Sequence, residues 1–231
     1  MIKEKSYEKY WDQNISKWGD LYLDISHGQE TLTGNRAVAW IYNRIVVPYE
    51  ANLMKIRYKK TIEFIKENVG QYSTVNDIGC GTGIFSVECL LRGAKVNALD
   101  LSQSSLDQTK KNIESVCAKF YENVKFVKCD LQEIKAPQSD CTICVGVLPY
   151  IDDVEAFLQN ILMPTEVAFI QFSEKSSPSN IVRRLFPFLN VRRLKFQSEA
   201  QIISIAKSLG HVIVSSEKFA TGRLLTFQKV A

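Results

Sequence analysis

Short apolar runs alternate with amphipathic segments from residue 74 to the end of the chain. The runs are rich in Val, Ile, Leu and Phe, as buried strands are, and the segments between them place apolar residues at helical spacing. Strands that alternate with helices indicate βαβ units and a mostly parallel sheet with helices on both faces. We predict strands over 74–78, 95–99, 124–128, 141–145, 166–172, 211–219 and 224–230.

The connections between these strands complete the expected topology. Only a tight turn at Thr221-Gly222 separates the last two strands, so they must form an antiparallel hairpin at one edge of the sheet. Right-handed crossovers place ligands outside the carboxyl ends of the parallel strands. We expect helices over 84–92, from Ser102 to about Cys117, from Asp152 or Asp153 to Leu162, and between Ser198 and Gly210.

The first seventy residues follow a helical pattern instead. One helical region runs over about 35–69, where Pro48 is expected to divide it because proline cannot continue the backbone hydrogen-bond ladder. An earlier helical region, nearer the N-terminus, carries a stripe of aromatic side chains at helical spacing. The aromatic members of this stripe are Tyr7, Tyr10, Trp11 and Trp18.

The strongest local motif is the glycine-rich turn Asp77-Ile78-Gly79-Cys80-Gly81-Thr82-Gly83, between the first predicted strand and the helix that follows. Glycine lets the backbone turn sharply and approach a ligand closely. Asp100 ends the next strand about 20 residues later, where a carboxylate can accept hydrogen bonds from both ribose hydroxyls. The third glycine stands one position earlier than in the nicotinamide fingerprint. The turn therefore suits a nucleoside without a pyrophosphate.

These residues resemble the Rossmann-like, or class I, S-adenosylmethionine-dependent methyltransferases, over roughly residues 61–231. The resemblance implies a doubly wound α/β fold. Its sheet would be mostly parallel and seven-stranded, in the order 3-2-1-4-5-7-6, with the last strand antiparallel. It also implies S-adenosylmethionine as cofactor, S-adenosylhomocysteine as product, and an N-terminal helical cap. We therefore expect a cap segment over 1–60 and a cofactor-binding domain over 61–231.

The resemblance also implies which residues contact the cofactor. Asp130, after the third strand, would meet the exocyclic amine of adenine, with Leu131 beside the ring. The loop from Gly146 to Tyr150 would lie at the methionine end and the acceptor. Asp77 and Asp100 have alternative roles, as a turn residue and a helix cap. The expected cofactor-binding residues are Asp77, Gly79, Cys80, Gly81, Gly83, Asp100, Leu101, Asp130, Leu131 and Gly146.

Two departures from the family bear on the class of acceptor and on whether a metal is used. The loop after the fourth strand reads Val147-Leu148-Pro149-Tyr150, without the Asn/Asp-Pro-Pro-Tyr of enzymes that methylate exocyclic base nitrogens. The carboxylates nearest to this loop, Asp152 and Asp153, also serve as helix caps, so we predict no metal site. The glycine-rich turn is similar to that of the small-molecule branch, which acts on quinone precursors, sugars and tetrapyrroles.

The candidates for catalysis and acceptor binding each have an alternative role. His27 is either a general base in the cap or a surface histidine, and Tyr150 is the other candidate catalytic residue. The aromatic stripe either lines an acceptor pocket or packs. The basic and apolar segment 181–196, with Arg183 and Arg184, is either a solvated connection or a lid. As a lid it would admit an anionic or amphiphilic acceptor, in contact with a membrane surface.

Composition bears on the partners and the cellular location that we expect for this protein. The formal charge of +4 over 231 residues is mildly basic and far below that of a dedicated nucleic-acid binder, so it says little about a nucleic-acid partner, which we do not expect. No apolar run approaches the roughly 20 residues of a membrane span. Without a secretory signal, the six cysteines are expected to be reduced in the cytoplasm. Cys141 and Cys144 form a C-x-x-C, but residues i and i+3 of a strand face opposite sides. This favours core packing over a redox or zinc pair.

The predicted function is the in-line transfer of a methyl group to an oxygen or nitrogen of a small-molecule acceptor. The sulfonium methyl is already activated, so the main task of the protein is orientation, which can supply roughly 7–11 kcal/mol. Two alternatives remain open at this point. One is a cofactor- or partner-binding protein without catalysis, and the other is an RNA or protein methyltransferase. The sequence specifies no oligomeric state.

Overall fold

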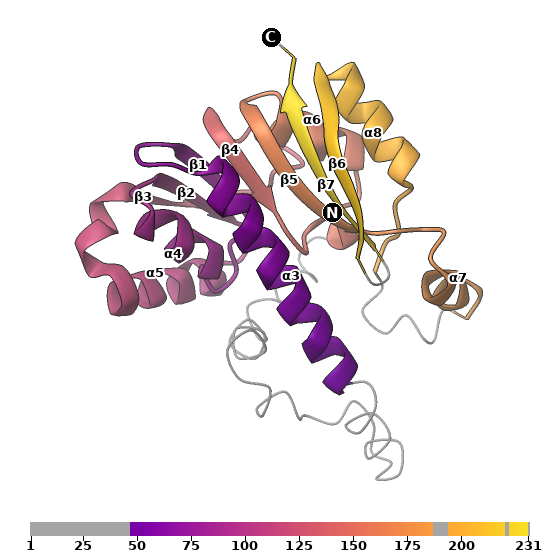
Figure 1. Ribbon diagram of the computed structural model, residues 1–231, viewed down its shortest axis with the longest axis horizontal. Helices are drawn as coiled ribbons and strands as arrows, with labels where there is room; N and C mark the ends of the chain where they lie inside the picture. The colour runs from indigo at the N-terminus through magenta and orange to yellow at the C-terminus, as the bar shows by residue number, and fades with distance from the viewer. Residues whose placement is uncertain (1–46, 187–193, 220–221, 231) are drawn as a thin grey trace.

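Seven strands form one sheet in the order β3-β2-β1-β4-β5-β7-β6 (Figure 1). The computed structural model describes residues 47–186, 194–219 and 222–230, with side chains from residue 54 onward. β1 to β5 pair in parallel, and β7 is antiparallel to both β5 and β6. The predicted order and the antiparallel last strand are confirmed. The strands are β1 (Thr74–Ile78), β2 (Lys95–Asp100), β3 (Val124–Lys128), β4 (Ser139–Cys144), β5 (Thr165–Ser173), β6 (His211–Phe219) and β7 (Gly222–Lys229).

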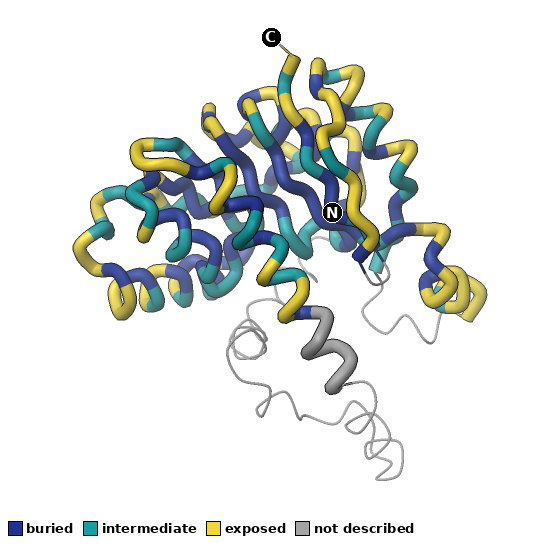
Figure 2. Tube along the Cα trace, viewed as in Figure 1, coloured by how far each residue is buried: buried dark blue, intermediate teal, exposed yellow. Residues whose placement is uncertain are grey.

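Helices cover both faces of the sheet, as predicted. One apolar core joins one sheet face to α3 (Val47–Asn68), α4 (Ile84–Leu91) and α5 (Gln103–Cys117). A second core joins the opposite face to α6 (Val154–Leu162) and α8 (Glu199–Ser208). Figure 2 shows the central strands buried along most of their length between these layers. Burial on both faces explains why these strands are continuous apolar runs in the sequence.

The C-x-x-C of β4 divides between the two cores. Cys141 belongs to the core under α3 to α5, and Cys144 belongs to the core under α6 and α8. Both thiols are fully buried, and both cysteines are free. The two sulfur atoms therefore lie on opposite sides of the sheet, which confirms the interpretation of this pair as core residues.

Pro48 lies near the N-terminal limit of the described residues. α3 spans Val47–Asn68 and contains Pro48 near its N-terminal end, and the predicted division of the region 35–69 at Pro48 involves residues outside the described ones and stays a prediction. Proline is tolerated there because the first N–H groups of a helix have no intrahelical acceptor. α3 crosses the predicted boundary at residue 60 without interruption, and the ring of Phe64 stacks on Phe169 of β5 at 4.8 Å between centroids. The division into 1–60 and 61–231 stays a prediction.

One helix was not predicted at all. α7 (Pro178–Leu185) follows β5 and extends away from the sheet in Figure 1. Ile181, Val182 and Leu185 are exposed on it. Propensity and periodicity are weak signals in an eight-residue helix of this kind, which is why the sequence left 181–196 as a connection or lid. No helix among the described residues is long and apolar enough to cross a membrane.

Two glycines near the β6–β7 hairpin provide a test of the fold. A Cβ added at Gly222 would lie 2.0 Å from the carbonyl oxygen of Phe172, whereas one added at Gly210, whose φ is +80°, would meet nothing within 4 Å. Overpacking typically costs about 1–3 kcal/mol and occasionally more. We expect Gly222→Ala to lower the free energy of unfolding by about 3 kcal/mol in urea titrations.

The matched variant Gly210→Ala carries backbone strain but no clash. Its expected cost is about 1–2 kcal/mol, the penalty for an L-residue in the left-handed region. Equal losses in the two variants would contradict the close packing of β7 against the carboxyl end of β5.

Candidate active site

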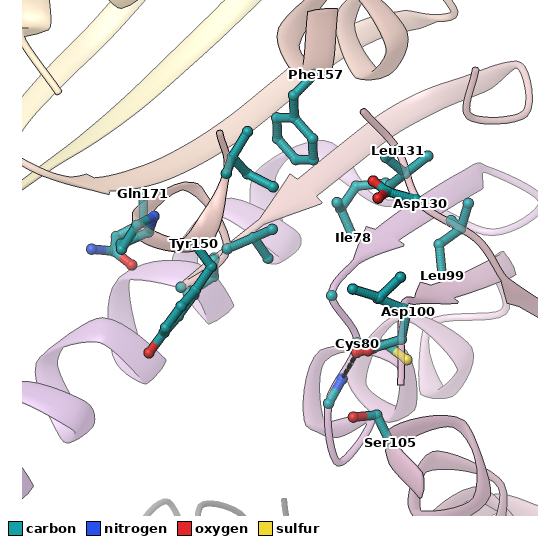
Figure 3. A pocket seen from close by; sticks show the side chains of 18 of the residues that line it. Ile78, Cys80, Leu99, Asp100, Ser105, Asp130, Leu131, Tyr150, Phe157 and Gln171 are labelled. Atoms are coloured by element: carbon teal, nitrogen blue, oxygen red, sulfur yellow. Dashed lines mark hydrogen bonds between the residues drawn. The ribbon is translucent and has the colours of Figure 1, made fainter. Parts of the chain in front are cut away.

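A cavity of about 290 Å³ opens at the carboxyl ends of the central strands (Figure 3). It lies where the strand order reverses between β1 and β4, the switch point at which doubly wound sheets bind ligands. The glycine-rich turn, the loop after β3 and the 3-10 helix η4 (Leu148–Tyr150) form most of its wall, and α3 contributes Arg57. The sequence predicted this location correctly.

The glycine-rich turn requires its glycines for two separate reasons. Gly79, Gly81 and Gly83 have φ values of 65°, 59° and 77°, a region that is strained for other residues. A Cβ at Gly79 would also lie 2.4 Å from Val147 Cγ2, and one at Gly83 would lie 2.6 Å from Thr109 Cγ2. The glycines therefore let the turn pack against the loop after β4 and against α5.

The N–H groups of the turn are largely occupied within the protein. Those of Gly79 and Cys80 both donate to the carbonyl oxygen of Leu99, at 2.8 and 3.1 Å. The N–H of Gly83 donates to the carbonyl oxygen of Cys80 at 2.8 Å, and that of Gly81 donates to a carboxylate oxygen at 3.1 Å. A phosphate-binding turn keeps such N–H groups for its ligand. This turn is therefore poorly suited to a pyrophosphate.

Two side chains of α5 hold the turn from outside. Thr109 Oγ1 donates to the carbonyl oxygen of Gly81 at 3.0 Å, and Asn112 Nδ2 donates to that of Thr82 at 2.7 Å. Neither residue was predicted from the sequence. Threonine and asparagine on a helix carry no motif, and only the packing of α5 against the turn reveals their role.

Asp100 connects the end of β2 to the turn. Its Oδ2 accepts the N–H of Gly81 at 3.1 Å, and its Oδ1 accepts the N–H of Ser102 at 2.8 Å. Ser102 caps α5 by accepting the N–H of Ser105, so the cap is the serine and not Asp100. Burial raises the pKa of Asp100, and the two N–H donors oppose that shift. The carboxylate lines the cavity, where its remaining lone pairs can accept ribose hydroxyls.

Asp77 lies beneath the turn and is not among the residues that line the cavity. Its side chain is buried, and its Oδ2 accepts the hydroxyl of Ser86 at 2.6 Å. Burial raises the pKa of Asp77 to about 6, and the nearby charge of Asp100 adds to the shift. Gly83 also does not line the cavity. The other eight predicted cofactor-binding residues all line the cavity.

Cys80 lines the cavity as a neutral thiol. Burial raises its pKa well above the ordinary value, and the charges of Asp100 and Asp77 raise it further. Thr109 Oγ1 also donates to its sulfur atom at 3.4 Å. A thiol that stays protonated is a poor nucleophile. Cys80 therefore fits the interpretation of a small residue packed beside a ligand.

The loop after β3 closes the far side of the cavity. Asp130 and Leu131 both line it, as predicted. Asp130 Oδ1 accepts the N–H of Gln132 at 2.9 Å, and Asn160 Nδ2 of α6 donates to the carbonyl oxygen of Leu131 at 3.0 Å. Gln132, which the sequence did not single out, accepts the N–H groups of Asp152 and Asp153 through its Oε1.

The two carboxylates near this loop have structural partners. Asp153 caps α6 by accepting the N–H of Ala156 at 3.0 Å, and Asp152 pairs with Lys195. Across the described residues, no three His, Cys, Asp or Glu side chains are grouped to hold a metal ion.

The opposite wall of the cavity contains polar side chains from three other elements. Tyr150 belongs to η4, Gln171 and Ser173 belong to β5, and Arg57 belongs to α3. Figure 3 shows Tyr150 and Gln171 across the cavity from Asp100. Of these residues, only Tyr150 was predicted from the sequence, because Arg57 and Gln171 lie in no motif and reach the cavity only through the packing of α3 and β5.

The remaining predicted residues lie elsewhere. Arg183 and Arg184 are on α7 and do not line this cavity, and Arg184 borders a separate depression beside α8. His211 is buried, with its Nε2 at 3.0 Å from the carbonyl oxygen of Thr165, as befits a structural histidine. Tyr7, Tyr10, Trp11, Trp18 and His27 lie outside the described residues.

The sheet order, the glycine-rich turn and the carboxylate at the end of β2 form the arrangement that the resemblance to class I methyltransferases implies. Residues 76–163 match the model of a methyltransferase domain family. This match agrees with the predicted class of methyltransferases over this part of the chain.

Comparisons with known proteins agree with this class. The chain is 23% identical over 190 residues to a ribosomal protein L11 methyltransferase of Thermoanaerobacter sp., an alignment that covers 82% of this chain and 54% of the relative. It is 29% identical over 126 residues to a ubiquinone biosynthesis O-methyltransferase of Rickettsia bellii, with 50% and 49% covered. The chain thus spans about half the length of these relatives.

A solved structure resembles the whole fold. The crystal structure of magnesium protoporphyrin IX methyltransferase from Synechocystis, with S-adenosylhomocysteine bound, superposes with a TM-score of 0.71 at 18% identity. The match covers 98% of this chain and 100% of that one. At this identity the likeness shows a shared fold.

The buried carboxyl of Asp77 predicts a specific pH dependence of stability. Its pKa is about 6 in the folded protein against an ordinary value of 3.8, so the folded state binds this proton more tightly. The free energy of unfolding therefore falls as pH rises from about 4 to 6, by about 3 kcal/mol from this group. Urea titrations should show the Asp77→Asn variant gaining that amount relative to the wild type between pH 4 and 7.

Asp107→Asn is the matched control, because Asp107 is exposed and accepts only from Gln103 in the described contacts. Its difference from the wild type should stay flat over the same range. A flat difference for Asp77→Asn as well would contradict the buried, protonatable state of Asp77.

Proposed function

We propose that this protein binds S-adenosylmethionine and transfers its methyl group in line to an oxygen or nitrogen of a small-molecule acceptor. The observation that carries the proposal is the carboxylate of Asp100. It stands on the cavity wall at the end of β2, next to a glycine-rich turn whose N–H groups are already used. This combination suits ribose hydroxyls without a phosphate.

The residues around the cavity fit the rest of such a cofactor. Asp130 and Leu131 offer an acceptor for the exocyclic amine and an apolar contact for the adenine ring, as the resemblance implies. Gly79 lets the turn pack closely against Val147 in the loop after β4, where a Cβ would clash, and both residues line the cavity. The sulfonium supplies an electrophilic methyl group, so the protein has mainly to bind and orient the acceptor.

The wall opposite Asp100 supports a small acceptor. Tyr150, Gln171 and Ser173 offer neutral hydrogen-bonding groups within a cavity, where an acceptor would be surrounded on several sides. Ubiquinone precursors and magnesium protoporphyrin IX, named for two similar proteins, are small molecules of this kind. Tyr150 is the described residue that we propose for contact with the reacting group, and the proposed location of the protein is the cytoplasm.

A protein acceptor is the second candidate. It is favoured by the alignment with ribosomal protein L11 methyltransferases, which covers more of this chain than the alignment with the ubiquinone enzymes. The two candidates share the cofactor site and differ only in what occupies the wall of Tyr150 and Gln171.

Calorimetry with S-adenosylhomocysteine tests the cofactor site. We expect Asp100→Ala to weaken binding at least tenfold, because two ribose hydroxyls lose a charged acceptor worth about 1.5–3 kcal/mol. Asp107→Ala, an exposed carboxylate on α5, should bind within twofold of the wild type. Unchanged affinity in Asp100→Ala would overturn the proposed site.

Methyl transfer itself separates the two acceptor classes. Protein supplied with S-adenosylmethionine carrying a radiolabelled methyl group should label members of a panel of phenols, amines and carboxylates. Ribosomal protein L11 and total RNA are tested in parallel. Label that enters L11 alone would favour the second candidate, and label in none of the three would contradict catalysis.

A further inference from the structure

Gln171 of β5 is a buried polar residue with unused hydrogen-bonding capacity on the cavity wall. Its side chain is 6% exposed, and its Oε1 has no hydrogen-bond partner among the described residues. Leaving a buried amide oxygen unpaired is costly, and native proteins rarely do so without a functional reason. An apolar side chain of the same size would fill this position without that cost.

The orientation of Gln171 follows from the alternation of β5. Phe169 packs in the core under α3, whereas Ile170 and Phe172 pack in the opposite core. Gln171 therefore points to the α3 side of the sheet, one residue pair beyond Phe169, where the core ends and the cavity begins. Ser173 follows on the same side and also lines the cavity.

Gln171 also stands away from the proposed nucleoside site. Asp100 ends β2, and β1 and β4 lie between β2 and β5. Three strand spacings amount to about 14 Å. Figure 3 agrees, with Gln171 beside Tyr150 at one end of the cavity and Asp100 at the other. A group bound at Gln171 is therefore beyond the ribose, on the acceptor side.

We propose that the side-chain amide of Gln171 binds the acceptor, through a hydroxyl group that the acceptor carries. The inference rests on the proposed function and names the acceptor class as hydroxylated, such as a phenol or catechol. The last torsion of glutamine is broad and roughly two-fold, so the amide can present either its oxygen or its NH₂ group to the cavity. A hydroxyl, which both donates and accepts, can pair with either atom.

Gln171 is in this role a positioning residue for the acceptor. It holds one hydroxyl at the carboxyl end of β5, while Tyr150 flanks the same end of the cavity from η4. The oxygen that has no partner among the described residues is then the cost of a site that becomes satisfied only when the acceptor binds. Replacing it should stabilise the free protein and weaken acceptor binding together.

The test compares Gln171→Met with the wild type in three measurements. The first is the melting temperature without ligand, which should rise by at least about 2 °C because an unpaired buried amide is removed. The second is the affinity for S-adenosylhomocysteine, which should stay within twofold. The third is titration of the S-adenosylhomocysteine-saturated protein with catechol, whose affinity should fall at least fivefold.

Two controls isolate the hydrogen bond. Veratrole, the dimethyl ether of catechol, has the same ring without hydroxyl donors, so it should bind more weakly than catechol and equally to both proteins. Gln103→Met replaces an exposed glutamine of α5 that donates to Asp107, and it should raise neither the melting temperature nor any dissociation constant.

Each contrary result overturns the proposal in a distinct way. An unchanged or lower melting temperature would mean that the amide is satisfied in the free protein. Loss of S-adenosylhomocysteine affinity would assign Gln171 to the cofactor. Absent or unaltered catechol binding would reject the hydroxylated acceptor. Failure of the proposed function is distinguishable, because it appears as the absence of S-adenosylhomocysteine binding in the wild type.

Discussion

The hydrogen bond from the N–H of Gly81 to the carboxylate of Asp100 joins the two elements on which the site depends. It ties the glycine-rich turn after β1 to the end of β2, and Ser102 extends the connection to the start of α5. The side chains of Thr109 and Asn112 on α5 donate hydrogen bonds to carbonyl oxygens of the same turn. The turn is thereby fixed from both sides before any ligand arrives. Preorganisation of this kind reduces the ordering cost of binding.

The hydrogen bond between Gly81 and Asp100 also distinguishes the roles of the two carboxylates, Asp100 and Asp77. Asp100 is held at the cavity wall by backbone donors, which oppose the rise in its pKa that burial causes. Asp77 is enclosed below the turn with one hydroxyl donor, and its pKa rises to about 6. Two acids of one sequence motif thus serve different purposes, one facing the ligand and one supporting the turn. The cavity continues past them to a wall of neutral polar groups on η4 and β5.

Much of this arrangement follows from the sequence. β3 and β6 begin and end where the apolar pattern predicts, and Ser102 caps α5 as expected. Eight of the ten expected cofactor-binding residues line the cavity, because strand ends and glycine turns leave local signals. α7 was missed because eight residues give too little periodicity. Arg57, Thr109, Asn112, Gln132 and Gln171 have no local signal at all.

The resemblance to the class I methyltransferases implied the order of the sheet, which the structure confirms, and the proposed cofactor. The sequence by itself determined the class of fold and the place of the cavity. These depend on periodicity and on short motifs, which are properties of neighbouring residues. Only the tertiary structure decided which side chains hold the turn and that Asp77 lies below the cavity. It also decided that Gln171 faces the cavity with an oxygen that has no partner in the part of the chain that the structure describes. Those features arise where segments tens of residues apart pack together, and no pattern along the chain records such contacts.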